Sequence, residues 1–342
     1  IYRSYKPGAP HTFVRNPYYC AVDSAGHQLP YLDRIVIDVK TPSLIPVAAS
    51  NGELSMQDRH IFYEDHTLLL GGMAKGDYRV LHWFPATRSV FTIFPVLNRQ
   101  RDPAQPETGK KAALLNDRRF RQALSLAIDR RAIIDAVFNG QGEPAQLDGG
   151  PLSDFHSEEL FKSFTAHDPA EANRLLDGIG LTQRDSEGFR TFTDGSRMTF
   201  FLHLTSANIT IEPAQFVIDD WAKVGVRTIL RIEGRPLFYA EKAAFEHDFD
   251  VWTGNSEFDP LLDPRNFVPT FGESFFAPGY GLWYRYGGLY GDPAAREQKG
   301  AIEPPRNGPL RQEMELLDRA YTAPSLGEAK KEFAAIQHIA AE

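Results

Sequence analysis

Three carboxylates stand close together after residue 252: Glu257, Asp259 and Asp263. Pairs of such groups cleave glycosidic bonds in hydrolases, where they lie at a defined separation and one has a raised pKa. A single carboxylate can instead bind a cationic group of a ligand, and Asp259-Pro260 is also a common turn start. Closeness in sequence does not decide among these roles, so all three stay open at this point.

Aromatic residues surround these carboxylates. Trp252 ends a predicted strand, and the loops beyond it contain five more large rings: Phe258, Tyr280, Trp283, Tyr284 and Tyr286. Ligands bind at strand ends in open α/β sheets, which makes Trp252 the ring with the strongest claim to a ligand contact. Core packing is the alternative for Trp252 and the better explanation for any one of the other rings.

Motifs for other chemistries are absent or incomplete. His60, Glu64 and His66 have the side chains of metal ligands, but their spacing fits no standard motif. Residues 140–145 (GQGEPA) imitate a dinucleotide fingerprint, yet they follow a predicted helix and contain a proline. The chain has no G-x-S-x-G, no G-x-x-x-x-G-K-[ST] and no H-E-x-x-H. We therefore predict no metal, no cofactor and no ATPase activity.

Composition and length exclude several classes of protein. The 342 residues include 37 Lys and Arg against 45 Asp and Glu, a net charge of −8, which disfavours a nucleic-acid surface. A chain of this length predicts about two domains. No apolar run approaches the roughly 20 residues of a membrane-spanning helix. Cys20 is the only cysteine, so no internal disulfide can form.

The positions of these residues depend on the elements that carry them. Short β-branched or aromatic runs predict strands at 12–15, 35–39, 78–83 and 90–97, and the polar stretch 98–111 predicts a boundary. One helix is expected over 117–138, and another from Asp168-Pro169 to Gly180, where Asp168 would be the N-cap.

The later sequence alternates between strand and helix patterns. Strands near 198–204, 226–232 and 249–253 are separated by helices near 212–224 and 236–246, and Asp194-Gly195 predicts a hairpin turn before them. Such alternation favours an α/β lobe with a mixed sheet. Residues 260–308 are expected to form loops, followed by helices near 308–321 and 326–341.

Several segments, taken in chain order, resemble a known family. They are YKPG at 5–8, RNPYY at 15–19, QLPYLDRI at 28–35, NGEL at 51–54, DRRFRQALS at 117–125, AIDR at 127–130, residues 172–180, FD at 249–250 and DP at 263–264. This series resembles the oligopeptide and dipeptide type (family 5) of the extracytoplasmic solute-binding proteins of ABC importers. Ser55 stands where the family usually has an Asp.

The resemblance implies a fold and a location. The fold is a type II periplasmic-binding-protein-like α/β architecture, in which a mixed sheet is flanked by helices. Residues 1–97 would form a β-rich part of a first lobe and residues 98–342 a second lobe, with a hinge at Leu97 and Asn98. The chain would be a fragment of a monomeric protein of the periplasm or cell envelope, exported by a signal segment absent from this sequence.

The same resemblance implies a ligand site at the end of the Phe249-Asp250 strand, where family members place an Asp that binds a peptide ammonium. Counting without gaps puts Asp259 at this position. Matching Trp252-Thr253-Gly254 to a W-T-G-D motif puts Asn255 there instead, and an amide cannot form the ion pair. Both alignments stay open. The residues expected to line the ligand are Trp252, Thr253, Gly254, Asn255, Phe258 and Asp259.

The functional hypothesis is capture of a peptide-like solute between two lobes and its delivery to a membrane permease. A ligand that touches both lobes would favour the closed form by its differential affinity for it. A carbohydrate-binding protein of the same fold is the alternative. A glycoside hydrolase using the carboxylates from Glu257 to Asp263 is a further hypothesis, as is a sensory or chaperone module without transport.

Overall fold

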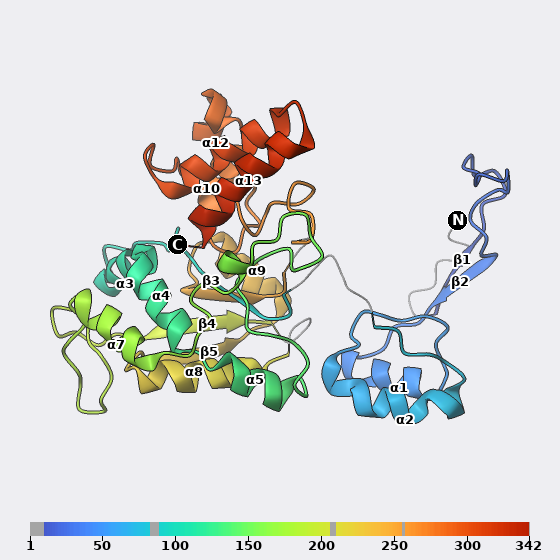
Figure 1. Cartoon of the computed structure of the whole chain (residues 1–342), viewed down its shortest axis with the longest axis horizontal. Helices are drawn as coiled ribbons and strands as arrows, with labels where there is room; N and C mark the ends of the chain where they lie inside the picture. The colour runs from blue at the N-terminus through green and yellow to red at the C-terminus, as the bar shows by residue number, and fades with distance from the viewer. Residues whose placement is uncertain (1–9, 83–88, 206–209, 255–256, 342) are drawn as a thin grey trace. The chain divides into compact units, whose positions relative to one another are not determined.

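The computed structural model divides the chain into two compact units, residues 1–81 and 82–342. It describes residues 10–82, 89–205, 210–254 and 257–341. Figure 1 shows the first unit in blue and the second from cyan to red. The lobe boundary predicted at 97/98 stays a prediction about a complete protein. Within this chain, strand β3 (Thr92–Pro95) already pairs with the sheet of the second unit.

The first unit combines two short strands with two helices. Strands β1 (His11–Val14) and β2 (Arg34–Ile37) pair antiparallel, which confirms the strands predicted at 12–15 and 35–39. The helices are α1 (Ile45–Ser50) and α2 (His66–Gly76), preceded by the 3-10 turns η1 (Pro42–Leu44) and η2 (Tyr63–Asp65). These helices were not predicted, so the unit is less rich in strands than expected. The strand predicted at 78–83 is wrong over 78–82, its described part.

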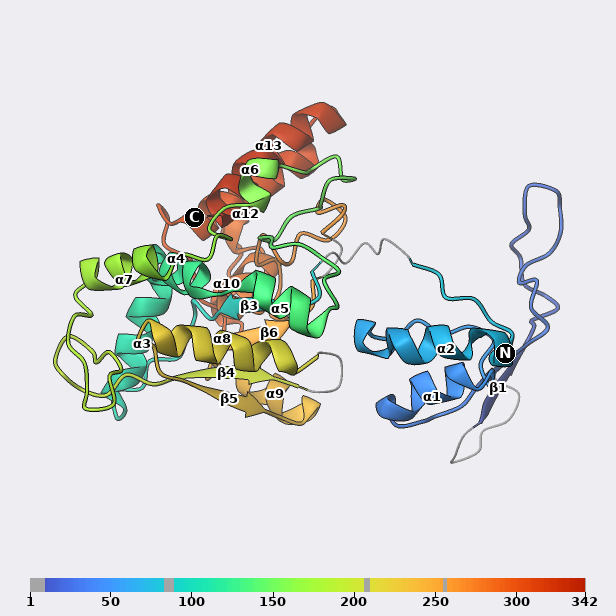
Figure 2. The same ribbon diagram turned by 60° about the horizontal axis from the view of Figure 1, so that its bottom comes forward.

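A four-stranded mixed sheet forms the centre of the second unit, in the order β3-β6-β4-β5. β4 (Phe200–Leu204) runs parallel to β5 (Thr228–Ile232) and to β6 (Phe249–Trp252), while β3 runs antiparallel to β6. Helices α8 (Glu212–Lys223) and α9 (Arg235–Ala243) make the two crossovers, and Figure 2 shows α8 alongside β4 and β5. The predicted alternation and mixed sheet are confirmed.

Helices cover both faces of this sheet, because neighbouring strand residues point to opposite sides. On one face, Phe200 contacts Phe120 of α4 (Arg118–Ala127), and Phe249 contacts Trp221 of α8. On the other face, Trp252 contacts side chains of α9. Helices packed on both faces of the sheet therefore fix the positions of the strand residues.

The helix predicted over 117–138 is two helices, α4 and α5 (Arg130–Val137). The chain bends at Asp129, whose backbone N–H donates to Asp220 Oδ2 of α8 at 2.8 Å. The Asp129 side chain then accepts a hydrogen bond from the N–H of Ala132 at 3.0 Å and caps the new helix. The polar stretch 98–111 also contains the start of an unpredicted helix, α3 (Pro106–Asn116).

Further helices complete the second unit. Helix α7 (Pro169–Gly178) confirms the helix predicted after Asp168, and α12 (Pro309–Thr322) and α13 (Leu326–Ala340) confirm the two predicted at the end. The segment 260–308, predicted as loops, contains short helices that were missed. These are α10 (Pro278–Arg285), the 3-10 turn η3 (Gly288–Tyr290) and α11 (Ala294–Glu297). Earlier in the chain, α6 (Glu158–Phe161) is another short helix.

A buried ionic cluster links helix α3 to the segment after β3 and to the residue before β6. Asp248 is fully buried and forms ion pairs of 2.8 Å with Arg99 and with Lys111. Its Oδ2 also accepts the backbone N–H of Phe201 at 2.9 Å. A buried carboxylate needs such partners, because an unpaired charge in this interior would be strongly destabilising.

Candidate functional site

The strand end predicted to meet a ligand is firmly packed. Trp252 pairs in register with Thr92 and exposes 8% of its surface. Its ring stacks on Phe275 at a centroid distance of 5.2 Å and contacts Phe238 and Tyr239 at 6.0 and 5.9 Å. Within this unit Trp252 is therefore a core residue, the alternative weighed from the sequence, and its contact with a ligand stays a prediction.

The residues after Trp252 turn back against the unit. The N–H of Gly254 donates to the carbonyl of Ser89 at 2.8 Å, while Thr253 is half-buried. A Cβ at position 254 would lie within 2.5 Å of the carboxylate of Glu257, so a larger residue would force that side chain to move. Asn255, the alternative ammonium-binding position, lies outside the described residues.

Among the described residues of the predicted set, Phe258 and Asp259 are accessible, as is half-buried Thr253. Phe258 exposes 40% of its surface, and Asp259 is half-buried. The carbonyl of Asp259 accepts the N–H of Leu262 at 3.1 Å, so this residue opens a turn, as Asp-Pro often does. Opening a turn leaves the carboxylate available for a ligand, and that role stays a prediction.

The carboxylates considered for hydrolysis have structural partners. Glu257 is fully buried, and its Oε1 accepts a hydrogen bond from Asn266 Nδ2 at 2.8 Å. Asp263 accepts from Arg265 Nε at 2.6 Å. These bonds hold both side chains in place within the second unit.

The predicted hinge residues are tied to their neighbours in the second unit. The N–H of Leu97 donates to the carbonyl of Phe276 at 2.7 Å, and its carbonyl accepts from Asn116 Nδ2 at 2.9 Å. Asn98 is buried, and its Oδ1 accepts the N–H of Tyr280 at 3.2 Å. A hinge at these residues would therefore lie beside the anchored end of β3.

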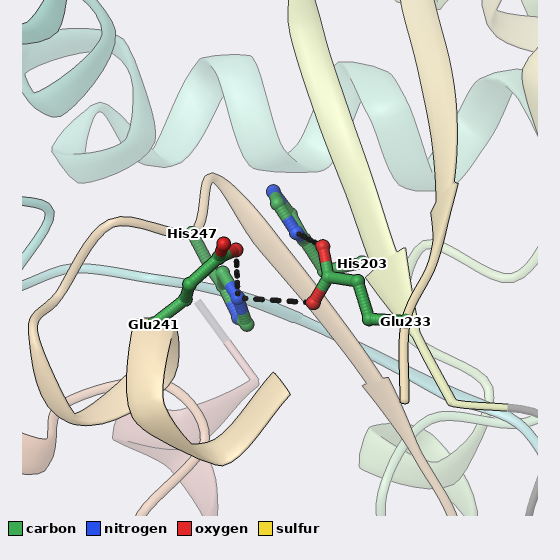
Figure 3. Close-up of side chains that lie close together, drawn as sticks. All are labelled: His203, Glu233, Glu241 and His247. Carbon is green, nitrogen blue, oxygen red and sulfur yellow. Dashed lines mark hydrogen bonds and ion pairs between the residues drawn. The ribbon is translucent and has the colours of Figure 1, made fainter. Parts of the chain in front are cut away.

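A second group of functional side chains converges on the face of the sheet covered by α9. His203 is near the end of β4, Glu233 directly follows β5, Glu241 lies in α9, and His247 precedes β6. Nitrogen and oxygen atoms from all four side chains lie within 4.8 Å of one another. Figure 3 shows the carboxylate of Glu233 beside the two imidazoles with one oxygen directed to each, while Glu241 reaches His247 from its helix. We call these four residues the His-Glu cluster.

The contacts in the His-Glu cluster are short. His203 Nδ1 lies 2.8 Å from Glu233 Oε1, and His247 Nε2 lies 3.6 Å from Glu233 Oε2 and 3.5 Å from Glu241 Oε2. The two imidazole rings stack with centroids 3.9 Å apart. On its other side, His247 Nδ1 contacts Asp250 Oδ1 at 2.5 Å.

Burial controls the charges of the His-Glu cluster. Burial, followed by the positive charge of His247, lowers the pKa of His203 to about 2. Burial also opposes a charge on His247, but the bond to Asp250 and the two glutamates outweigh it and raise the pKa of His247. The pKa values of Glu233 and Asp250 are raised, mainly because these carboxyls are desolvated. The two imidazoles and Asp250 are therefore held away from water, while Glu241 is partly exposed.

Sequence analysis missed the His-Glu cluster. Its members are spread over 45 residues from 203 to 247 and match no local motif. The available signal was topological: His203 and Glu233 stand at the carboxyl ends of neighbouring parallel strands, where side chains from distant segments meet. The His60, Glu64 and His66 group is not the one that converges among the described residues.

Comparison with known proteins places the chain in a family. Residues 1–277 match the model of the middle part of bacterial extracellular solute-binding proteins, family 5. The chain belongs to this family. The resemblance inferred from the sequence and the α/β fold predicted from it are confirmed.

Named relatives of the chain come from several bacteria. It is 28% identical over 221 residues to a probable ABC transporter-binding protein of Deinococcus radiodurans, covering 62% of this chain and 35% of that one. It is 26% identical over 273 residues to the periplasmic alpha-galactoside-binding protein of Rhizobium meliloti, covering 76% and 38%. The chain thus spans little more than a third of these relatives.

A solved structure of an oligopeptide-binding protein, OppA, superposes with a TM-score of 0.67 at 31% identity, covering 96% of this chain and 52% of that one. The proteins named in these comparisons are solute-binding proteins. Among the described residues, no helix is both long and apolar enough to cross a membrane.

Proposed function

We propose that this chain is part of the substrate-binding component of an ABC importer, which captures a peptide-like solute outside the cytoplasm and passes it to a membrane permease. The match of residues 1–277 to the solute-binding family carries this proposal. A relative named as a probable ABC transporter-binding protein supports the transport role. The component acts by binding and not by catalysis.

A peptide is the preferred ligand class. The oligopeptide-binding OppA is 31% identical and is matched by 96% of this chain, a closer likeness than the 26% identity to the alpha-galactoside-binding protein. The latter relative makes an oligosaccharide the second candidate. Both ligand classes suit a site with an aromatic ring and polar groups, such as Phe258 and Asp259.

Asp259 is the residue proposed to bind the ligand's α-ammonium. Its half-buried carboxylate could form a charge-assisted hydrogen bond that strengthens as the ligand excludes water. Thr253, Gly254 and Phe258 would line the same end of the site. Asn255 is the competing position, and an amide there would favour a sugar or a blocked peptide. Closure about Leu97 and Asn98 completes the proposed mechanism.

Native mass spectrometry of the protein, purified gently from the cells that make it, tests the ligand class. We expect bound masses that denaturation releases and that tandem fragmentation sequences as peptides. Masses spaced by hexose units would overturn the peptide assignment in favour of the second candidate. Turnover of added chromogenic glycosides, lost in Glu257→Gln, would overturn the non-catalytic role.

Asp259→Asn tests the ammonium contact, since asparagine keeps the turn but removes the charge. Truncating a buried charge pair costs about 2 to 5 kcal/mol, so peptide affinity measured by calorimetry should fall at least about 30-fold. Glu273→Gln removes an exposed charge from a later loop and should leave affinity unchanged. An N-acetylated peptide should bind wild type and Asp259→Asn equally; unaltered affinity of the free peptide for Asp259→Asn would eliminate the ion pair.

A further inference from the structure

We propose that the His-Glu cluster, formed by His203, Glu233, Glu241 and His247, is a binding site for a divalent transition-metal ion of the zinc class. This site lies within the second unit and is independent of the proposed solute function. Its four side chains come from two strand ends, one helix and one loop, so a bound ion would join all of these segments.

The spacing of the donor atoms fits one small ion. Zinc lies about 2.0 to 2.2 Å from nitrogen and oxygen ligands in a tetrahedron, so its ligands stand about 3.4 Å from one another. In the structure, His203 Nδ1 and Glu233 Oε1 are 2.8 Å apart, His247 Nε2 lies 3.5 and 3.6 Å from the two glutamates, and all four donor atoms lie within 4.8 Å of one another. The two stacked imidazoles would have to rotate apart to direct both ring nitrogens at the ion and so complete the tetrahedron.

A carboxylate that orients a metal-binding histidine is also in place. Histidines that bind metals usually use their other ring nitrogen to bond a carboxylate, which fixes the ring and its tautomer. His247 does this through Nδ1, which contacts Oδ1 of the fully buried Asp250 at 2.5 Å. The bond turns Nε2 of His247 toward the two glutamates (Figure 3).

Two buried polar atoms of the His-Glu cluster lack a hydrogen bond. His247 Nε2 and Glu233 Oε2 are buried and face each other at 3.6 Å, and neither atom has a hydrogen-bond partner among the described residues. Leaving buried polar atoms unsatisfied is costly. A cation bound between them would satisfy both atoms at once and would neutralise the two glutamate charges.

The donor set selects the kind of ion. Two imidazoles and two carboxylates suit zinc, cobalt or nickel, whereas calcium and magnesium prefer sites made of oxygen ligands alone. We therefore expect zinc and cobalt to bind and calcium to bind far more weakly. With four protein ligands the coordination is closed, so the ion would have a structural role.

Calorimetric titration of the full chain with zinc chloride, after removal of metals by a chelator, tests the site. We expect one equivalent to bind, a higher melting temperature, and the visible absorption of a four-coordinate ion when cobalt replaces zinc. Calcium should give none of these effects. Absence of saturable zinc binding would show that protons alone hold the cluster and would overturn the proposal.

Glu241→Gln locates the ion, because this side chain is the most accessible of the four. Loss of a ligand should weaken zinc binding by at least about ten-fold. Glu246→Gln, an exposed neighbour just after the helix, is the matched control and should bind zinc normally. Equal zinc affinity in the two variants would overturn the assignment. His203→Gln provides a second test if circular dichroism shows that Glu241→Gln is unfolded. Neither result depends on which solute the protein carries.

Discussion

Glu313 shows how a single residue can make stability depend on pH. This carboxyl on α12 is almost fully buried, and its Oε2 has no hydrogen-bond partner among the described residues. Burial raises its pKa well above the usual value of 4.5, and the positive charge of Arg121 on α4 offsets this only in part. The folded state therefore keeps a proton that the unfolded chain releases.

The sign of the pH dependence follows from this raised pKa. Above pH 4.5 the folded protein binds more protons than the unfolded chain, so its stability falls as pH rises toward the folded pKa. Glu313→Gln removes this loss. We expect the free energy of unfolding of the variant, relative to that of wild type, to rise by up to about 1.4 kcal/mol per pH unit in this window.

Chemical denaturation from pH 5 to pH 8 measures the gain for Glu313→Gln. Glu315→Gln, an exposed carboxylate on the same helix, serves as the control. The difference between Glu313→Gln and wild type should grow with pH, whereas the difference for Glu315→Gln should change little. A constant difference for Glu313→Gln would mean that this carboxyl does not hold its proton.

Helix α7 is the clearest case of an element set by its first residue. Asp168 Oδ1 accepts the N–H of Glu171 at 2.9 Å, and Pro169 occupies the first helical position. Asp168→Ala should lower the free energy of unfolding by about 1 kcal/mol. Asp168→Asn should keep most of the stability, since an amide oxygen also accepts this bond. Equal losses in the two variants, measured by urea denaturation, would contradict a capping role.

Caps and alternation could be predicted from sequence because they are local. Asp168-Pro169 is a local signal for the start of α7. The alternation of strand and helix patterns over 198–253 likewise predicts β4 to β6 with α8 and α9. The break between α4 and α5 could not be predicted, since apolar spacing continues across Ile128. It depends on Asp220, which lies 91 residues away in sequence.

The same limit explains the candidate sites. Trp252 ends a strand, as predicted, but only the fold shows that Phe275 and α9 enclose it. The His-Glu cluster needs the parallel register of β4 and β5 before His203 and Glu233 become neighbours. Residue types indicate which chemistry is possible. Contacts between segments distant in sequence determine which of these residues come together.

At the scale of the whole molecule, apolar burial is concentrated in the second unit. Both hydrophobic clusters lie between Phe94 and Ile336. In the described part of the first unit, the buried apolar side chains include Ala48 and Leu69, while every residue of β2 is exposed. Neighbouring strand residues point to opposite faces, so β2 exposes apolar side chains on both sides.

This distribution predicts that residues 82–342 fold on their own, because they contain a closed sheet-and-helix core. Calorimetry of this segment should show one cooperative transition within about 3 °C of the main transition of the full chain. Residues 1–81 alone should show none, since a two-stranded sheet with little buried apolar surface is marginal in water. Non-cooperative melting of 82–342, or its rapid digestion by a protease that spares the full chain, would show that the first unit contributes to that core. A stable 82–342 segment that still binds one zinc ion would confine the His-Glu cluster's role to the second unit.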